Sequence, residues 1–259
     1  MKAVILAAGR GSRLRAVTGA LPKCLARVGS LTLLERQILA LRAHDVRDII
    51  VVAGCGISAV RPVCQGRASV LHNARYASTN SLYSLWLARE VLTEAFVVLN
   101  GDVLFHPQLL SDLLTARHDD ALLMEARGDA VFSDEEMKVQ VRAGRVVDIA
   151  KTIASAEADG ENVGIAKFGA VGARVLIDEM DRLVVDGGSR AWLPAAFAAF
   201  IHRRPLHVVE TRGYPWLDVD FPEDYWRACA ELLPALEPDR PVHCARTPAT
   251  ASGRKLHHV

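Results

Sequence analysis

The first hundred residues alternate short apolar runs with stretches in which apolar residues recur every three or four positions. Uninterrupted apolar runs are typical of strands buried on both faces, and the wider spacing is typical of helices with one apolar face. The pattern predicts strands over residues 3–8, 48–53, 68–72 and 95–99 and helices over residues 31–43 and 81–92. Because strands and helices alternate, we expect an α/β fold with a doubly wound, parallel sheet.

From about residue 119 the apolar runs shorten, and some follow one another without a helix between them. The pattern predicts strands over residues 121–125, 138–142, 145–149, 163–168 and 206–210 and helices over residues 173–185, 192–200 and 222–233. We expect residues 119–233 to continue the sheet of residues 1–118, which gives a mixed but mainly parallel sheet. Prolines and polar residues dominate residues 234–259, which we expect to be a disordered tail.

Charge and cysteine usage narrow the possible partners and surroundings. Charged residues make up 24% of the 259 residues and the formal net charge is +1, so we expect no nucleic acid and no membrane as partner. The five cysteines are widely spaced and include no CxxC pair, which argues against a disulfide scaffold and favours a reducing cytoplasm. We therefore expect a cytoplasmic protein, present as a monomer or homodimer.

A basic loop with two glycines follows the first strand. Gly9 and Gly11 allow backbone amides to turn inward and approach a ligand closely. The cations beside them are Arg10, Arg13, Arg15 and Lys23. We interpret the loop as a polyphosphate site; the plainer alternative is a surface turn with solvated charges. The loop lacks both the third glycine of a dinucleotide fingerprint and the Gly-Lys-Ser/Thr of a Walker loop, which disfavours hydride transfer and P-loop chemistry.

Aspartates occur at two further positions of interest. Gly101-Asp102 follows the apolar run 95–99, and Asp218-Val219-Asp220 precedes the last predicted helix. Open α/β sheets bind ligands at the carboxyl ends of their strands, where the glycine loop and Asp102 both fall. For Asp220, capping of the following helix is an alternative role.

Taken in order, these pieces resemble nucleotidyltransferases that make activated sugars and alcohols from an NTP and a phosphorylated acceptor. The residues that carry the resemblance are Leu6-Ala7-Ala8-Gly9-Arg10-Gly11-Ser12-Arg13-Leu14, Pro22-Lys23, Gly101-Asp102 and Phe221-Pro222-Glu223-Asp224-Tyr225. The stretch from Asn73 to Leu85 is similar to that of the phosphocholine cytidylyltransferase branch. The resemblance implies a Rossmann-like, glycosyltransferase-A-like fold, with residues 1–118 as the nucleotide-binding half and 119–233 as the acceptor-binding half.

The resemblance also implies roles for individual residues. Lys23 would stabilise charge on the α-phosphate, and Arg13 would hold the β- and γ-phosphates. Asp102 with Asp218 or Asp220 would bind Mg2+, an ion that hard carboxylate oxygens suit. The residues expected at the nucleotide are Leu6, Ala7, Ala8, Gly9, Gly11, Ser12, Arg13, Lys23, Asn80, Ser81 and Gly101.

The acceptor side is predicted from scattered residues. The candidates are Tyr83, Glu161, Lys167, Trp192, Tyr214 and Trp216. Lys167 could reach an acceptor phosphate, and the aromatic residues Trp192, Tyr214 and Trp216 could form a cage for a quaternary ammonium group. Ordinary packing is the alternative for these aromatic residues. Lys151 is either a second phosphate ligand or a surface lysine.

We therefore expect a Mg2+-dependent nucleotidyltransferase that transfers CMP from CTP to phosphocholine or a phosphonate and releases pyrophosphate. A sugar-1-phosphate nucleotidyltransferase that uses GTP, UTP or CTP is the alternative within the same class. A catalytically silent nucleotide-binding protein is the alternative from another class.

Overall fold

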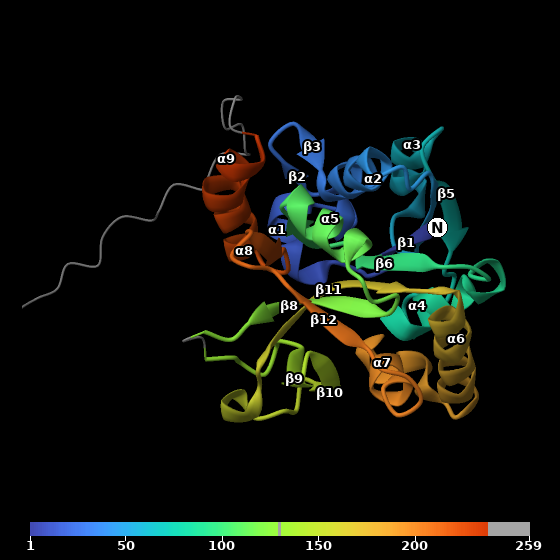
Figure 1. The fold of residues 1–259 in the computed structure, drawn as a ribbon. Helices are drawn as coiled ribbons and strands as arrows, with labels where there is room; N and C mark the ends of the chain where they lie inside the picture. Colours follow the sequence, from blue (N-terminus) through green and yellow to red (C-terminus); the bar gives the residue numbers. More distant parts are fainter. Residues whose placement is uncertain (129–130, 238–259) are drawn as a thin grey trace, which may run out of the picture.

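A computed structural model describes residues 1–128 and 131–237 and shows a β-sheet with helices on both faces (Figure 1). Within these residues the main sheet has nine strands. In spatial order they are β5 (Ser69–His72), β4 (Asp48–Ala53), β1 (Lys2–Ala7), β6 (Phe96–Asn100), β11 (Gly160–Phe168), β8 (Ala121–Ala126), β12 (His207–Glu210), β10 (Arg145–Ala150) and β9 (Lys138–Arg142). The predicted α/β class with a mixed sheet is confirmed.

Strand direction differs between the two parts of the sheet. β1 pairs in parallel with β4 and β6, and β4 pairs in parallel with β5, as expected for residues 1–118. β11 joins the second part by pairing antiparallel with β6 and with β8. Beyond it, β12 is parallel to β8, whereas β10 is antiparallel to β12 and β9. Residues after 119 thus continue the same sheet, and the parallel pairing is concentrated in the first part.

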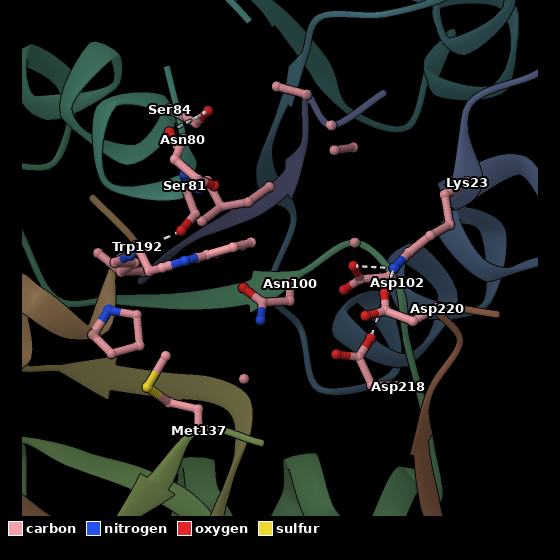
Figure 2. Close-up of a pocket in the computed structure, with 18 of the residues that line it drawn as sticks. Lys23, Asn80, Ser81, Ser84, Asn100, Asp102, Met137, Trp192, Asp218 and Asp220 are labelled. Carbon is pink, nitrogen blue, oxygen red and sulfur yellow. Dashed lines mark hydrogen bonds and ion pairs between the residues drawn. The ribbon is translucent and has the colours of Figure 1, made fainter. Parts of the chain in front are cut away.

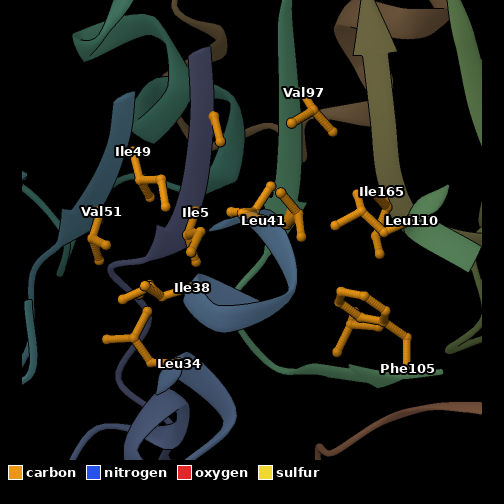
Figure 3. Packing of buried hydrophobic residues seen from close by; sticks show 14 of the residues in the cluster. Ile5, Leu34, Ile38, Leu41, Ile49, Val51, Val97, Phe105, Leu110 and Ile165 are labelled. Carbon is orange, nitrogen blue, oxygen red and sulfur yellow. The ribbon is translucent and has the colours of Figure 1, made fainter. Parts of the chain in front are cut away.

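Helices bury apolar residues against both faces of the sheet. One face is covered by α2 (Leu33–Ala43), α3 (Ile57–Cys64) and α5 (Pro107–Thr115). The other face is covered by α4 (Ser81–Leu87), α6 (Ala170–Val185) and α7 (Pro194–Phe200). Figure 3 shows the first face, where side chains of α2 pack against β1 and β4. The sheet is therefore buried on both sides, which explains its uninterrupted apolar runs.

Several short elements were not predicted. They are α3, α5 and β7 (Val103–Phe105), together with the small elements α1 (Arg15–Thr18), β2 (Arg27–Val28) and β3 (Leu31–Thr32). α3 contains Pro62, a residue that normally argues against a helix interior. β7 is three residues long and pairs antiparallel with β13 (Trp216–Asp218). The two- and three-residue strands carry too few residues for a periodic pattern, whereas α5 does have Leu109, Leu110 and Leu113 at helical spacing, a signal from which it could have been predicted.

The C-terminal helix is longer and less regular than expected. It runs through α8 (Pro222–Arg227), a π-helical turn (Ala228–Leu232) and α9 (Leu233–Leu236). The predicted tail therefore begins too early, because Glu237 still forms an ion pair with Arg36 at 2.7 Å. Residues 238–259 lie outside the described residues. Cys24, Cys55 and Cys64 are free thiols.

Candidate active site

A cleft of about 460 Å³ opens at the carboxyl ends of β1 and β6 (Figure 2). Its walls come from the glycine loop, the start of α4, the turn between β6 and β7, β11 and the segment around β13. The location is the one expected for ligand binding in an open α/β sheet.

The glycine loop packs directly on Lys23. Gly11 has a φ of +57°, a backbone conformation that residues other than glycine rarely adopt. A Cβ atom at Gly11 would lie 2.9 Å from the Cβ of Lys23, so any larger residue would displace the lysine. Pro22 is extended, and Lys23 opens a short 3-10 helix. The sequence from Gly9 to Lys23 thus fixes where the lysine side chain starts.

The Lys23 ammonium lies among three carboxylates (Figure 2). Its Nζ is 2.7 Å from Asp102 Oδ2 and 4.0 Å from Asp218 Oδ1, and it donates a hydrogen bond to Asp220 Oδ1. The lysine side chain is only 14% exposed. Residues from three distant segments therefore meet at one charged centre.

Pairing between β7 and β13 brings the C-terminal aspartates to Asp102. Asp218 stands opposite Val103, and the Val219 amide donates to the Asp102 carbonyl at 3.1 Å. Asp224 accepts from the amides of Asp220 and Phe221 at 3.1 and 2.8 Å and so caps α8. Helix capping as the role of Asp220 is therefore wrong, because Asp224 caps the helix and Asp220 contacts Lys23.

The three aspartates fit a divalent cation. One carboxylate oxygen from each aspartate lies within 4.8 Å of the corresponding oxygens of the other two. Oδ1 of Asp102 and Oδ1 of Asp218 are buried and have no hydrogen-bond partner. Burial and the Asp102 carboxylate raise the pKa of Asp218 above its ordinary value, so negative charge here is incompletely balanced. Carboxylate oxygens without donors are the ligands that Mg2+ prefers.

The residues predicted for the nucleotide share this cleft. Those that line it are Leu6, Ala7, Ala8, Gly9, Gly11, Ser12, Arg13, Lys23, Asn80, Ser81 and Gly101. Arg13 is 3.9 Å from Asp220 and 3.4 Å from Glu135, and its guanidinium lies over the Phe221 ring at 5.0 Å. Two cations, Lys23 and Arg13, therefore contact the carboxylate of Asp220.

Hydrogen bonds stiffen the wall formed by α4. The Asn80 side chain accepts from the Ser81 amide at 2.8 Å, and Ser81 Oγ accepts from the Leu193 amide at 2.8 Å. The buried Asn73 donates to Ser84 Oγ at 3.1 Å. This wall therefore presents fixed polar groups to a ligand in the cleft.

Three of the predicted acceptor residues line the same cleft: Glu161, Trp192 and Trp216. Trp192 lies beside Ser81 (Figure 2). Burial, with smaller contributions from Glu136 and Glu125, raises the pKa of Glu161 to about 7. Trp192 is 52% exposed, and Lys151 Nζ lies 5.2 Å from its ring centre. Lys151 therefore belongs to the cleft and is not an isolated surface lysine.

The other three predicted acceptor residues point elsewhere, which corrects the prediction for each. Lys167 is 4% exposed and donates to the carbonyls of Leu114 and Ala116, at 3.3 and 2.8 Å, at the end of α5. Tyr83 stacks on Trp86, and Tyr214 stacks on His106. None of these three lines the cleft, so of the three residues predicted to form an aromatic cage only Trp192 and Trp216 line it, together with Tyr76 and Phe197.

Some cleft residues were not singled out from the sequence. Asn100 and Met137 point into the cleft (Figure 2), and Glu135 lies between Arg13 and Lys151. Glu135 belongs to an Asp134-Glu135-Glu136 run, the one signal that could have drawn attention to it. Asn100 and Met137 carry no such signal, because single amides and methionines are common in any fold.

Comparisons with known proteins agree with this site. The chain is 32% identical over 228 residues to a bifunctional IPC transferase and DIPP synthase of Rubrobacter xylanophilus, over 86% of this chain and 50% of that one. It is 31% identical over 155 residues to a choline-phosphate cytidylyltransferase of Streptococcus pneumoniae, over 57% of this chain and 67% of that one. The solved CTP:phosphocholine cytidylyltransferase from Streptococcus pneumoniae has a TM-score of 0.72 and 25% identity, over 87% and 96% of the two chains.

The chain spans about half the length of the bifunctional relative. In the part of the chain that the structure describes, every helix is too short or too polar to cross a membrane.

The model of the MobA-like NTP transferase domain matches residues 3–199, which contain the glycine loop, Lys23 and Asp102. The resemblance to nucleotidyltransferases is thereby confirmed, and the chain belongs to the MobA-like NTP transferase domain family.

Proposed function

We propose that the protein transfers CMP from CTP to a small phosphorylated alcohol or a phosphonate, with Mg2+ as cofactor, and releases pyrophosphate. The observation that carries the proposal is the meeting of Lys23 with Asp102, Asp218 and Asp220 beside the glycine loop. Phosphoryl-type transfer depends on positioning and charge neutralisation more than on a covalent nucleophile. The cleft offers both.

The reaction assigns a distinct task to each charged residue. An oxygen of the acceptor phosphate bonds to the α-phosphorus, and the bond from that phosphorus to the pyrophosphate oxygen breaks. Lys23 donates to α-phosphate oxygens as their negative charge increases, and Arg13 binds the departing pyrophosphate. Asp102, Asp218 and Asp220 would hold Mg2+, which supplies further neutralisation of phosphate charge when bound.

The preference for CTP is supported by the similar proteins and by the polar groups that line the cleft. Both the Streptococcus pneumoniae relative and the solved structure are, by name, cytidylyltransferases. Residues Ala7 to Gly9 and the fixed polar groups of Asn80 and Ser81 line the same cleft. Rigid donors and acceptors of this kind read base edges well.

An acceptor with a cationic end suits the remaining part of the cleft. Trp192 and Trp216 supply aromatic faces, and Glu161 supplies a carboxylate whose charge is poorly solvated. Aromatic faces and carboxylates both attract ammonium groups. The amide side chains of Asn100 and Asn162, which also line the cleft, favour instead the hydroxyls of a sugar 1-phosphate. The expected cytoplasmic location and the monomeric or homodimeric state stay predictions.

A pyrophosphate-release screen tests the proposal. CTP, GTP, UTP and ATP are combined with phosphocholine, phosphoethanolamine, aminoalkylphosphonates and sugar 1-phosphates, each with Mg2+ or with a chelator. We expect release with CTP and a cationic acceptor, and none with the chelator. A preference for sugar 1-phosphates would establish the alternative within the class. Nucleotide binding without release from any pair would point to a silent binding protein.

Two aromatic variants make the acceptor assignment sharper. Trp192→Ala should raise the KM for a cationic acceptor about tenfold, because a cation–aromatic contact is lost. Tyr214→Ala is the matched control, since Tyr214 lies outside the cleft against His106. Equal effects of the two substitutions would contradict an acceptor site at Trp192.

A further inference from the structure

Gln37 is a buried polar residue on the apolar face of α2. Its neighbours on that face are Leu34, Ile38 and Leu41, which pack under the sheet (Figure 3). Gln37 is only 1% exposed. Glutamine is seldom buried so fully unless its amide is hydrogen-bonded. We therefore expect the Gln37 amide to form hydrogen bonds that an apolar side chain at this position could not form.

The partners of Gln37 are the two ends of the turn that carries Asp102. Its Nε2 donates to the carbonyl of Asn100 and to the carbonyl of Val103, each at 2.8 Å. Gly101 and Asp102 lie between these two carbonyls. Because both partners are acceptors, only the NH2 end of the amide can face them.

The oxygen atom of the Gln37 amide shows that burying this side chain lowers the stability of the fold. Gln37 Oε1 is buried and has no hydrogen-bond partner. A helix that needed only apolar packing would be more stable with leucine or methionine here, since neither leaves a buried acceptor unpaired. The hydrogen bonds to Asn100 and Val103, and not the packing of α2, therefore explain why an amide is present at this position.

Two further contacts hold the same turn from other sides. The Gly101 amide donates to the Leu6 carbonyl at 2.9 Å, and the Val219 amide donates to the Asp102 carbonyl at 3.1 Å. A Cβ atom at Gly101 would lie 2.8 Å from the Leu6 oxygen, so the turn rests directly on β1. β1, β13 and α2 therefore each fasten the turn, and the α2 contact is the one made by a side chain.

We infer that Gln37 is a positioning residue that fixes Asp102 at the cation site. The inference rests on the proposed function, in which Asp102 holds Mg2+. Asp102 Oδ1 is buried without a hydrogen-bond donor, and Lys23 contacts the other oxygen of this carboxylate, Oδ2. The position of the Asp102 backbone, from which the carboxylate projects, depends on the turn, and Gln37 clamps that turn at both ends.

The test compares Gln37→Met with Leu41→Ala. Methionine keeps the length but has no donor, and Leu41 lies on the same face of α2 but has no side-chain atom that could form a hydrogen bond to the turn. Hydrogen–deuterium exchange is measured on the full chain, and the Mg2+ concentration for half-maximal turnover is measured with CTP. In Gln37→Met we expect amides 100–103 to exchange at least about tenfold faster relative to the rest of the chain, and the Mg2+ requirement to rise about tenfold while the CTP KM changes less than about threefold. Leu41→Ala should show neither selective change.

Each other outcome has a definite meaning. Exchange that rises no more in the turn than in Leu41→Ala would overturn the clamp. Faster exchange in the turn with an unchanged Mg2+ requirement would overturn the link to the cation site. If the Met variant does not fold, Gln37→Asn, which is one methylene shorter, replaces it in both measurements. Wild-type protein without any turnover would refute the proposed function, while the exchange measurement would still decide whether the clamp exists.

Discussion

The residues expected at the nucleotide and those expected at the acceptor were placed in the cleft with different success. Every residue expected at the nucleotide lines the cleft. Of the six expected at the acceptor, only Glu161, Trp192 and Trp216 do. Most of the residues expected at the nucleotide belong to one contiguous motif, Leu6–Arg13. The residues expected at the acceptor are single side chains from separate elements.

Strand geometry explains why single side chains are harder to place. Successive side chains of a strand point to opposite faces, so an error of one position reverses the assignment. On β11, Ala166 lines the cleft, whereas its neighbour Lys167 faces the end of α5. The pairing of β11 with β8 also shifts between Asn162 and Ala166, which interrupts simple alternation. Knowing that a strand is present therefore does not tell which of its residues meet the ligand.

The largest expected effect lies at the nucleotide end, at Lys23. Lys23→Ala should lower kcat about a thousandfold, because the donor at the α-phosphate is lost in a site that water enters poorly. Steady-state kinetics measure the effect, and circular dichroism checks that the fold is kept. Lys2→Ala is the control, because Lys2 pairs with Asp48 away from the cleft. A near wild-type rate would show that Lys23 does not stabilise the transition state.

Asp102 should give the next largest effect. Asp102→Asn removes one charged ligand and should lower turnover at least about a hundredfold at any Mg2+ concentration. A Mg2+ titration of pyrophosphate release measures this. Asp112→Asn on α5, where the carboxylate accepts from Gln108, should stay within about twofold of wild type. Undiminished turnover of Asp102→Asn would refute the metal assignment.

Glu161 tests the acceptor end directly. Glu161→Gln should raise the KM for a cationic acceptor about tenfold and leave the KM for CTP unchanged, since one charged contact is lost. Initial rates with each substrate varied separate the two constants. A rise in the KM for CTP alone would indicate that Glu161 contacts the nucleotide and not the acceptor.

The same substitution should change the pH dependence of stability. The pKa of Glu161 is about 7 in the folded chain against an ordinary value of 4.5, so the native state binds the proton more tightly than the unfolded chain. Wild-type stability should therefore fall as pH rises through that window. Urea unfolding should show Glu161→Gln gaining about 2 kcal/mol over wild type between about pH 5 and about pH 8. An equal difference at both pH values would contradict the raised pKa.

Lys167 should give the smallest effect on catalysis. Lys167→Met should leave kcat and both KM values within about twofold, because the side chain is turned away from the cleft. The free energy of unfolding should fall by about 1–3 kcal/mol, since the carbonyls of Leu114 and Ala116 lose a buried donor. A large rise in the acceptor KM without loss of stability would restore Lys167 to the acceptor site.

The sequence allowed the main strands, the glycine loop and the aspartates to be predicted, because each is a continuous run or a motif. The pairing of β7 with β13 could not be predicted, since three-residue strands carry no pattern. Gln37 could have been noticed as a polar residue on the apolar face of a helix, but its partner carbonyls belong to a turn far along the chain. Contacts of that kind depend on the tertiary structure.

The contact between Lys23 and Asp220 also concerns how the protein is made. The two residues are 197 positions apart, so their contact closes a loop of nearly the whole described chain. Contacts between such distant residues form late and slowly. A nascent chain that ends before β13 has the glycine loop and Asp102 but lacks both other aspartates and the Val219 hydrogen bond. During synthesis, the chain should therefore acquire its catalytic centre only after almost every other element has left the ribosome.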